Sequence, residues 1–157
     1  MGSRPGRRAS TAQAESPVTD AEYEVLATFR YALRKFLRFS EAAARSHGLS
    51  PQQHQLLLAV KGFPGRDWAS VAELAERLQL ESHSVVGLID RLENAEWVRR
   101  TRHTADHRMT EVRLTEQGEA LLESLTVAHR AEFRQMAKLI ESLRRARTDR
   151  DDDPRRR

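Results

Sequence analysis

The segment from Ser70 to Gly118 restricts the possible folds of this chain more than any other part of it. It contains two short helix-like segments, SVAELAERLQL and ESHSVVGLIDRLENAEWV, followed by the arginine-rich sequence RRTRHTADHRMTEVRLTEQG. A helix of the second segment's size fits the major groove of duplex DNA, and a basic hairpin beside it can reach the phosphates and the minor groove. This order of elements predicts a DNA-binding regulator.

The composition excludes several other classes of protein. A chain of 157 residues fits one domain that buries roughly two-thirds of its unfolded surface. It has no cysteine, which excludes disulfides, thiolate metal sites and cysteine-based redox sensing. No run approaches the about 18 apolar residues of a membrane span, and the basic start MGSRPGRRAS lacks the apolar core of a secretory signal. We therefore expect a cytoplasmic protein.

Three regions can be distinguished along the chain. Residues 1–18 are rich in Arg, Ser, Ala and Pro without apolar periodicity, which predicts a disordered basic arm. Residues 147–157 form a charge run, which predicts a disordered, solvated tail. Residues 19–146 are expected to form a single domain. Its predicted fold is mainly α with a small β-wing, a winged helix-turn-helix over about 50–115 flanked by helices over 19–48 and 116–146.

Helix starts are clearly marked in the sequence. Thr19 with Glu22, Ser50 with Gln53 and Ser70 with Glu73 each match the capping-box pattern, and Pro51 occupies the favoured first helical position. The apolar spacing then predicts buried faces on the two short helices, made by Val71, Leu74, Ala75 and Leu78 and by Val85, Leu88, Ile89 and Leu92. A strand is predicted over Met109–Leu114 from its period-two alternation, and Thr115 is expected to cap the final helix.

The two terminal helices have more apolar length than one small winged domain can cover. Leu26, Phe29, Leu33, Phe36 and Leu37 lie at helical spacing in the first helix, and Leu122, Leu125, Met136, Leu139 and Leu143 lie near seven-residue spacing in the last. A partner subunit is the simplest cover, so we predict a homodimer whose dimerisation domain is built from both helices. The alternative is a stripe packed wholly within one chain.

The second helix of the pair is the expected recognition helix. Its buried set directs Ser82, His83, Ser84, Val86 and Gly87 towards the free face, and we predict that these residues contact DNA. Ser82 has the alternative of being only a helix cap. Gly87 would be explained by close approach of DNA or by close packing. Asp90 and Arg91 are more simply a structural ion pair or surface charges.

The hairpin indicates DNA binding more clearly than the overall charge does. The formal net charge of +4 would not by itself indicate nucleic acid. The five arginines of the hairpin face two acidic residues, a local excess of +3. Arg99, Arg100, Arg102 and Arg108, with Asp106 beside them, are predicted to contact DNA, because arginine at a narrow tip can enter the minor groove. The alternative is a solvated basic turn.

The segment ELAERLQLESHSVVGLIDRLENAEWVRRTRHTADHRMTEVRLTEQGEALL resembles the multiple-antibiotic-resistance-regulator (MarR) family of bacterial transcription factors, and LSPQQHQLLLAV resembles its second helix. The resemblance covers about residues 19–143, and DRLE, the wing pattern D-x-R and LTEQG are its most specific parts. It implies a dimeric winged helix-turn-helix protein, usually a repressor, that small aromatic or phenolic acids release from DNA.

Carried onto this chain, the resemblance makes residues 82–93 the recognition helix and residues 97–114 the wing. It places Arg108 in the minor groove and Asp106 against the Arg108 guanidinium. The sequence departs from the family pattern at Glu96, where the family often has glycine, and at Gly87, where arginine or another polar residue is frequent.

Nothing in the sequence predicts an enzyme, since it has no glycine-rich phosphate loop and no paired carboxylates in a recognisable context. We expect no catalytic residues and no cofactor. We also expect no metal site, because no histidine spacing assembles one on a single helix face. His54 and His129 could line a ligand cavity or be satisfied core or interface histidines. The expected partners are double-stranded DNA, a second copy of the chain and a small-molecule effector. The alternative function is a winged-helix module that docks an acidic protein.

Overall fold

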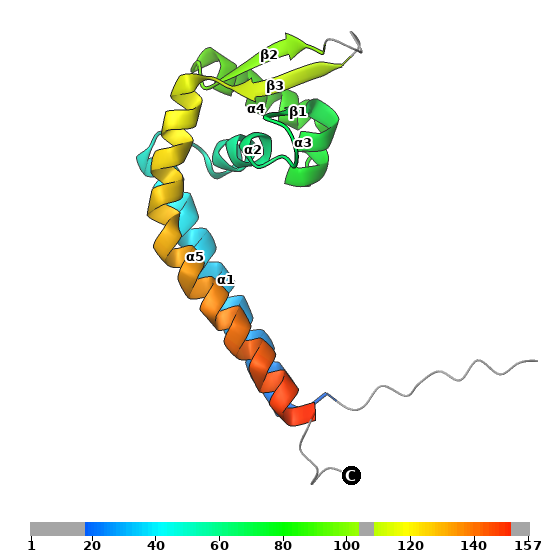
Figure 1. The fold of residues 1–157 in the computed structure, drawn as a ribbon, viewed down its shortest axis with the longest axis vertical. Coiled ribbons are helices and arrows are strands. Elements are labelled where there is room, and N and C mark those ends of the chain that lie inside the picture. The colour runs from blue at the N-terminus through cyan, green and yellow to red at the C-terminus, as the bar shows by residue number, and fades with distance from the viewer. Residues whose placement is uncertain (1–17, 104–108, 152–157) are drawn as a thin grey trace, which may run out of the picture.

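The computed structural model describes residues 18–103 and 109–151, with side chains as far as residue 143. Asp106 and Arg108, residues 1–17 of the expected arm and residues 152–157 of the expected tail therefore lie outside the described residues. The elements in chain order are α1 (Asp20–Ser46), α2 (Pro51–Lys61), β1 (Trp68–Ser70), α3 (Val71–Leu78), α4 (Ser82–Asn94), β2 (Val98–Arg102), β3 (Thr110–Leu114) and α5 (Glu116–Asp151). Figure 1 shows a lobe built from the short elements, from which α1 and α5 extend side by side as a long antiparallel pair.

The predicted helix starts are confirmed by their caps. The side chains of Thr19, Ser50 and Ser70 accept hydrogen bonds from the third residue of α1, α2 and α3, and the third residue's side chain returns to the cap in each case. Each reciprocal pair satisfies two backbone groups that a helix end would otherwise leave without a partner. Local sequence therefore fixes where these three helices begin.

A three-stranded antiparallel sheet of order β1-β3-β2 forms the wing and ties it to the lobe. Val98 pairs with Leu114 and Trp68 with Arg113, so β3 lies between the other two strands. The sequence predicted β2 and β3 but not β1. With only three residues, β1 is too short to show a period-two pattern, and its pairing with β3 is set by the tertiary structure.

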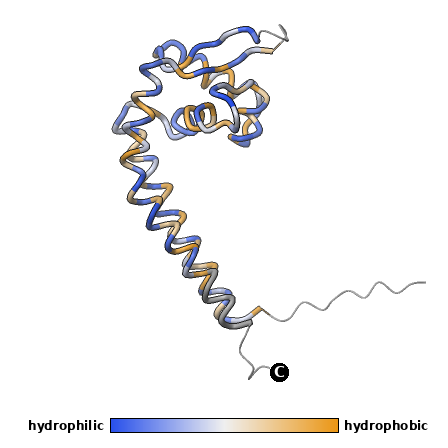
Figure 2. Tube along the Cα trace, viewed as in Figure 1, coloured by the Kyte–Doolittle hydropathy of each residue, from blue (hydrophilic) through white to orange (hydrophobic). Residues whose placement is uncertain are grey.

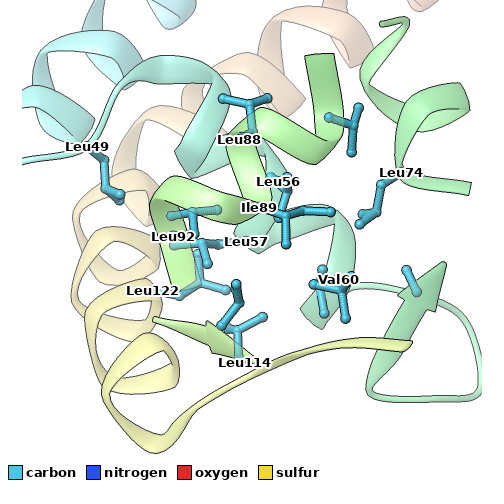
Figure 3. Close-up of a cluster of buried hydrophobic side chains, with 14 of the residues drawn as sticks. Leu49, Leu56, Leu57, Val60, Leu74, Leu88, Ile89, Leu92, Leu114 and Leu122 are labelled. Carbon is cyan, nitrogen blue, oxygen red and sulfur yellow. The ribbon is translucent and has the colours of Figure 1, made fainter. Parts of the chain in front are cut away.

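The core lies inside the lobe, around α2, and Figure 3 shows side chains from helices and sheet meeting there. The four residues predicted for α4 are all buried. The cluster also contains Leu56, Leu57 and Val60 of α2, Leu74 of α3, Val112 and Leu114 of β3, and Leu122 and Leu125 of α5. Because α5 contributes to this core, its first turns belong to the lobe and fix the direction in which the long helix leaves it.

Hydrophobic and hydrophilic residues alternate along the far part of α1 and α5, as Figure 2 shows, and several of the apolar side chains there are exposed. Seven large apolar residues of the two helices are exposed by 45% or more: Tyr23, Leu26, Tyr31, Leu37, Val127, Phe133 and Ile140. Of these, Leu26 and Leu37 belong to the predicted apolar stripe of the first helix, so the alternative that this stripe packs wholly within one chain does not hold at these two positions.

The end of α5 differs from the sequence prediction. The helix continues to Asp151, through residues 147–151, which were expected to be a disordered tail. Leu, Arg and Ala have high helix propensity, and the sequence contains no glycine or proline between Gly118 and Pro154 to stop the helix.

Among the described helices, none combines the length and the apolar character required to cross a membrane.

Candidate DNA-binding surface

The turn that follows α3 positions α4, the helix that the sequence predicts to read DNA. Gln79 adopts the left-handed conformation (φ 54°), and the backbone N–H of Leu80 donates back to the carbonyl of Ala75. This arrangement satisfies carbonyls at the end of α3 and reverses the chain within a few residues. The two helices then pack on each other in a helix-turn-helix.

The two faces of α4 differ sharply in exposure. Val85, Leu88, Ile89 and Leu92 are buried, whereas Ser82, His83, Ser84 and Val86 are exposed, and the exposed set includes the first three residues of the helix. Small polar side chains at the N-terminal end of a helix can approach base edges and phosphates without steric hindrance. The predicted contact residues of α4 are thus brought together on one free surface, with Gly87 half-buried beside them.

The N-cap residue of α4 is not Ser82, the residue that the sequence offered as a possible cap. Glu81 is the N-cap residue, Ser82 is the first residue within the helix, and no side chain caps the helix. The interpretation of Ser82 as a cap is therefore wrong. Backbone N–H groups at an uncapped helix start can bind an anionic oxygen, and the helix dipole favours negative charge there.

Gly87 has space around it in the folded chain. A Cβ atom at this position would meet only the Nη1 atom of Arg91, at 3.9 Å, an ordinary van der Waals distance. Close packing within the described chain therefore does not require glycine here. The glycine costs about 1 kcal/mol of helix stability relative to alanine.

The turn between α4 and β2 forms with Glu96 at the position where the family that the sequence resembles often has glycine. Glu96 adopts a left-handed conformation (φ 58°), while its N–H donates to the Glu93 carbonyl and that of Trp97 to the Leu92 carbonyl. This pair of hydrogen bonds is the Schellman helix end, which favours glycine at the left-handed position. The turn geometry is retained, with a strained residue in it.

The wing arginines divide into two groups. Arg99 and Arg102 are exposed, and within the described residues neither forms an ion pair. Arg100 instead lies on the same face of β2 as the buried Val98 and extends over α4. Its guanidinium is ion-paired with Asp90 and with Glu93, so Asp90 pairs with Arg100 and not with its helix neighbour Arg91.

The other side of the wing is held by residues that the sequence did not single out for this role. Arg113 of β3 is ion-paired with Asp67 and Glu111, and the hydrogen bond from Arg113 holds the pKa of Asp67 below its usual value. Trp68 packs against His103, with ring centroids 5.1 Å apart. These contacts join residues far apart in sequence, so no local pattern indicated them.

Arg66 makes further contacts with Trp68 at the base of the wing. Its guanidinium lies 3.7 Å from the ring centroid of Trp68 and 4.1 Å from that of Phe63, and it is ion-paired with Glu73. Burial acts to raise the pKa of Glu73, but hydrogen bonds from Ser70 and Arg66 lower it overall. Glu73 thus serves both the capping box of α3 and the base of the wing.

A cavity of about 500 Å³ opens where α1, α2 and α5 meet. Most of its lining is apolar, and it also contains two histidines and two arginines: Phe36, His54, Leu58, Thr126, His129, Arg130, Phe133 and Arg134. It therefore lies between the long helices and the lobe. Among the described residues, no group of three or more histidine and acidic side chains is placed to hold a metal ion.

His54 and His129 meet at this cavity. Their ring centroids are 5.1 Å apart, and Nδ1 of His129 lies 2.6 Å from the carbonyl oxygen of Leu125. Nδ1 of His54 and Nε2 of His129 are buried without a hydrogen-bond partner. Burial, with smaller contributions from His129 and His47, lowers the pKa of His54 to about 4. Both histidines therefore line this cavity, and within the described residues of the single chain each has one ring nitrogen without a hydrogen-bond partner.

Comparison with known proteins adds to this geometry. Residues 47–109 match the family model described as MarR family. The chain is similar to the HTH-type transcriptional repressor MdtR of Bacillus subtilis (strain 168), with 26% identity over 118 residues that cover 75% of this chain and 72% of that protein.

Two solved structures have similar folds. Apo wild-type MarR from E. coli has a TM-score of 0.64 at 16% identity, with 85% of this chain and 97% of that chain covered. BpsR of Bordetella bronchiseptica, whose DNA binding is regulated by 6-hydroxynicotinic acid, has a TM-score of 0.57 at 19% identity, with 78% and 98% covered.

Proposed function

Because the chain belongs to the MarR family of winged helix-turn-helix transcriptional regulators, we propose that it is a homodimeric repressor that binds a pseudo-palindromic operator and is released from it by a small aromatic or phenolic acid. The observation that supports this proposal most directly is the exposed first turn of α4, together with two exposed wing arginines that form no ion pair with any residue that the structure describes. Major-groove insertion requires such a surface.

In this proposal α4 enters the major groove, and Ser82, His83 and Ser84 contact base edges or phosphates. Val86, which is 40% exposed, contacts a thymine methyl group. Arg99 and Arg102 bind phosphates, which makes the affinity fall steeply with salt concentration. The resemblance assigns the minor-groove contact to Arg108, held by Asp106.

The exposed apolar residues of α1 and α5 support the dimer. Tyr23, Leu26, Phe133 and Ile140 are each at least half exposed in the single chain, and a second copy would remove this surface from water. A two-fold axis through these helices would place the two recognition helices about one DNA turn, or 34 Å, apart. The operator would then be an imperfect palindrome.

The cavity between α1, α2 and α5 supports an effector. Phe36, Leu58 and Phe133 offer an apolar lining for an aromatic ring, and Arg130 and Arg134 supply positive charge for an acidic group. A ligand here would touch both the long helices and the lobe. The dimer can bind the operator only when its two recognition helices are about one DNA turn apart. A ligand would therefore release DNA only if it bound more tightly to a conformation of the dimer with a different spacing.

Operator binding can be tested with DNA from upstream of the protein's own gene. A gel shift with excess competitor DNA, at two salt concentrations, should show a sequence-specific complex that weakens as salt rises. Footprinting should then show two protected half-sites, and added salicylate or 6-hydroxynicotinate should release the DNA. A protein-docking module would show no sequence preference. A chain that stayed monomeric at micromolar concentration and ignored every duplex at low ionic strength would overturn the proposal.

A further inference from the structure

We propose that Arg100 is a positioning residue for DNA binding, which holds the wing against the recognition helix by pairing with the carboxylates of Asp90 and Glu93, and that it does not itself contact DNA. The inference rests on the proposed DNA-binding function. It assigns to Arg100 a different role from that of its neighbours Arg99 and Arg102.

Arg100 engages both oxygens of one carboxylate. Its backbone N–H donates to Oε1 of Glu93 at 2.9 Å, and its Nη1 donates to Oε2 of Glu93 at 2.9 Å. The backbone bond fixes the position of strand β2 relative to α4, and the side-chain bond fixes the guanidinium. A flexible contact to solvent-exposed phosphate would need neither bond.

The remaining end of the guanidinium extends further along α4. Nη2 is paired with Oδ1 of Asp90 and donates to the carbonyl oxygen of Val86 at 3.4 Å. Residues 86, 90 and 93 are spaced at i, i+4 and i+7, so they follow one stripe of the helix. One arginine thus bridges two turns of α4 from the wing, and 30% of its side chain remains exposed.

Charge gives a second reason for this arrangement. Asp90 has 52% of its side chain exposed on the helix that is proposed to enter the groove, where a free carboxylate would repel phosphate. Arg100 pairs with both carboxylates and offsets one of their two negative charges. Arg99 and Arg102 have no carboxylate partner in the part of the chain that the structure describes, so their charge is available to phosphates.

The salt dependence of operator binding separates the two roles. Each phosphate contact that is lost lowers the slope of log K against log salt by about 1. Arg99→Gln should therefore lower both the affinity and the slope. Arg100→Gln should lower the affinity by about tenfold or more with the slope unchanged, because it leaves two uncompensated carboxylates and a loosened wing.

A charge-compensated variant tests the mechanism directly. Fluorescence anisotropy with a labelled operator would compare wild type, Arg100→Gln, the double variant Asp90→Asn/Glu93→Gln, and the triple variant that combines all three. The triple variant should recover at least about threefold of the affinity lost in Arg100→Gln, because the repulsion from both carboxylates is gone. If Arg100 contacted phosphate directly, Arg100→Gln would remove two contacts from the homodimer, one in each subunit. The slope would then be shallower by about 2, and the triple variant would show no recovery.

Arg100→Lys provides a second readout if Arg100→Gln does not fold. Lysine keeps the charge but cannot span three acceptors, so a positioning role predicts a clear loss of affinity. Retention of nearly wild-type affinity by Arg100→Lys would overturn the inference. Failure of the wild-type protein to bind any operator would overturn the proposed function itself. If the wild-type protein binds but Arg100→Gln loses affinity and slope as Arg99→Gln does, only the inference about Arg100 is overturned.

Discussion

The carbonyl group of Trp97 occupies the space where Gly118 would carry a side chain. A Cβ atom on Gly118 would overlap the Trp97 carbonyl oxygen and lie 2.9 Å from its carbonyl carbon. The same carbonyl accepts a hydrogen bond from the backbone N–H of Thr115, and the Thr115 hydroxyl caps α5 by accepting from Gly118. The motif LTEQG is therefore the joint between the wing and the long helix.

Gly118→Ala should destabilise the protein by about 1–3 kcal/mol, because backbone atoms must move to accept the methyl group. Chemical denaturation followed by circular dichroism would measure the loss. Ala120→Gly, on the same helix, is a matched control that should cost only about 1 kcal/mol through helix propensity. A Gly118→Ala protein as stable as wild type would contradict the contact with Trp97.

Glu96→Gly should stabilise the fold by about 1 kcal/mol, because Glu96 adopts a left-handed conformation (φ 58°) that costs a residue with a Cβ atom this much. The midpoint of urea denaturation is the measurement. Glu93→Gly, within α4, should have the opposite effect, since it introduces glycine at a helical position and removes a partner of Arg100. An unchanged or lower midpoint for Glu96→Gly would show that the turn is not strained.

Gly87→Ala should affect stability and DNA binding in opposite directions. The added methyl group has room in the free protein and raises helix stability by up to about 1 kcal/mol. If DNA approaches the α4 backbone closely at this position, the same methyl group should weaken operator binding. Thermal denaturation and operator titration of one preparation give both values, and unchanged affinity would leave close approach of DNA without support.

Arg108→Ala should weaken operator binding without disturbing dimerisation, because the resemblance places this residue in the minor groove. Operator titration and analytical ultracentrifugation would measure the two properties. Lys138→Ala, on α5 and distant from the wing, is the comparison for a simple loss of positive charge. Undiminished affinity in Arg108→Ala would remove the tip of the wing from the proposed interface.

His54 should make the protein less stable as the pH falls below about 6.5. In the folded state its pKa is lowered to about 4, whereas an unfolded histidine takes up its proton near pH 6.5. Between these values the unfolded state binds more protons, so the free energy of unfolding falls by up to about 1.4 kcal/mol per pH unit as pH decreases.

Replacement of His54 by phenylalanine should flatten this part of the pH profile. Denaturation at pH 7.5, 5.5 and 4.5 would give the slopes, which can be compared even if the variant differs in overall stability. Replacement of the exposed His83 by glutamine should keep the wild-type slope. Equal slopes for His54→Phe and wild type would show that the buried imidazole does not govern the acid stability.

Much of the fold could be predicted from the sequence because its determinants are local. Thr19, Ser50 and Ser70 bond to residues only three positions away, and the buried face of α4 follows from helical periodicity alone. The same periodicity identified Ser82, His83 and Ser84 as exposed. These features depend on the chain within one or two turns and need no knowledge of distant neighbours.

The long-range pairings were decided only by the tertiary structure. Sequence marked Arg99 and Arg100 as equivalent basic residues, but strand pairing exposes the first and turns the second onto Glu93 and Asp90. β1 becomes a strand only because β3 lies beside it. His54 becomes hard to protonate mainly because packing of the helices buries it, and to a smaller degree because α5 brings His129 against it. Periodicity determines which side of an element is buried, whereas the position of the neighbouring element determines which residues it meets there.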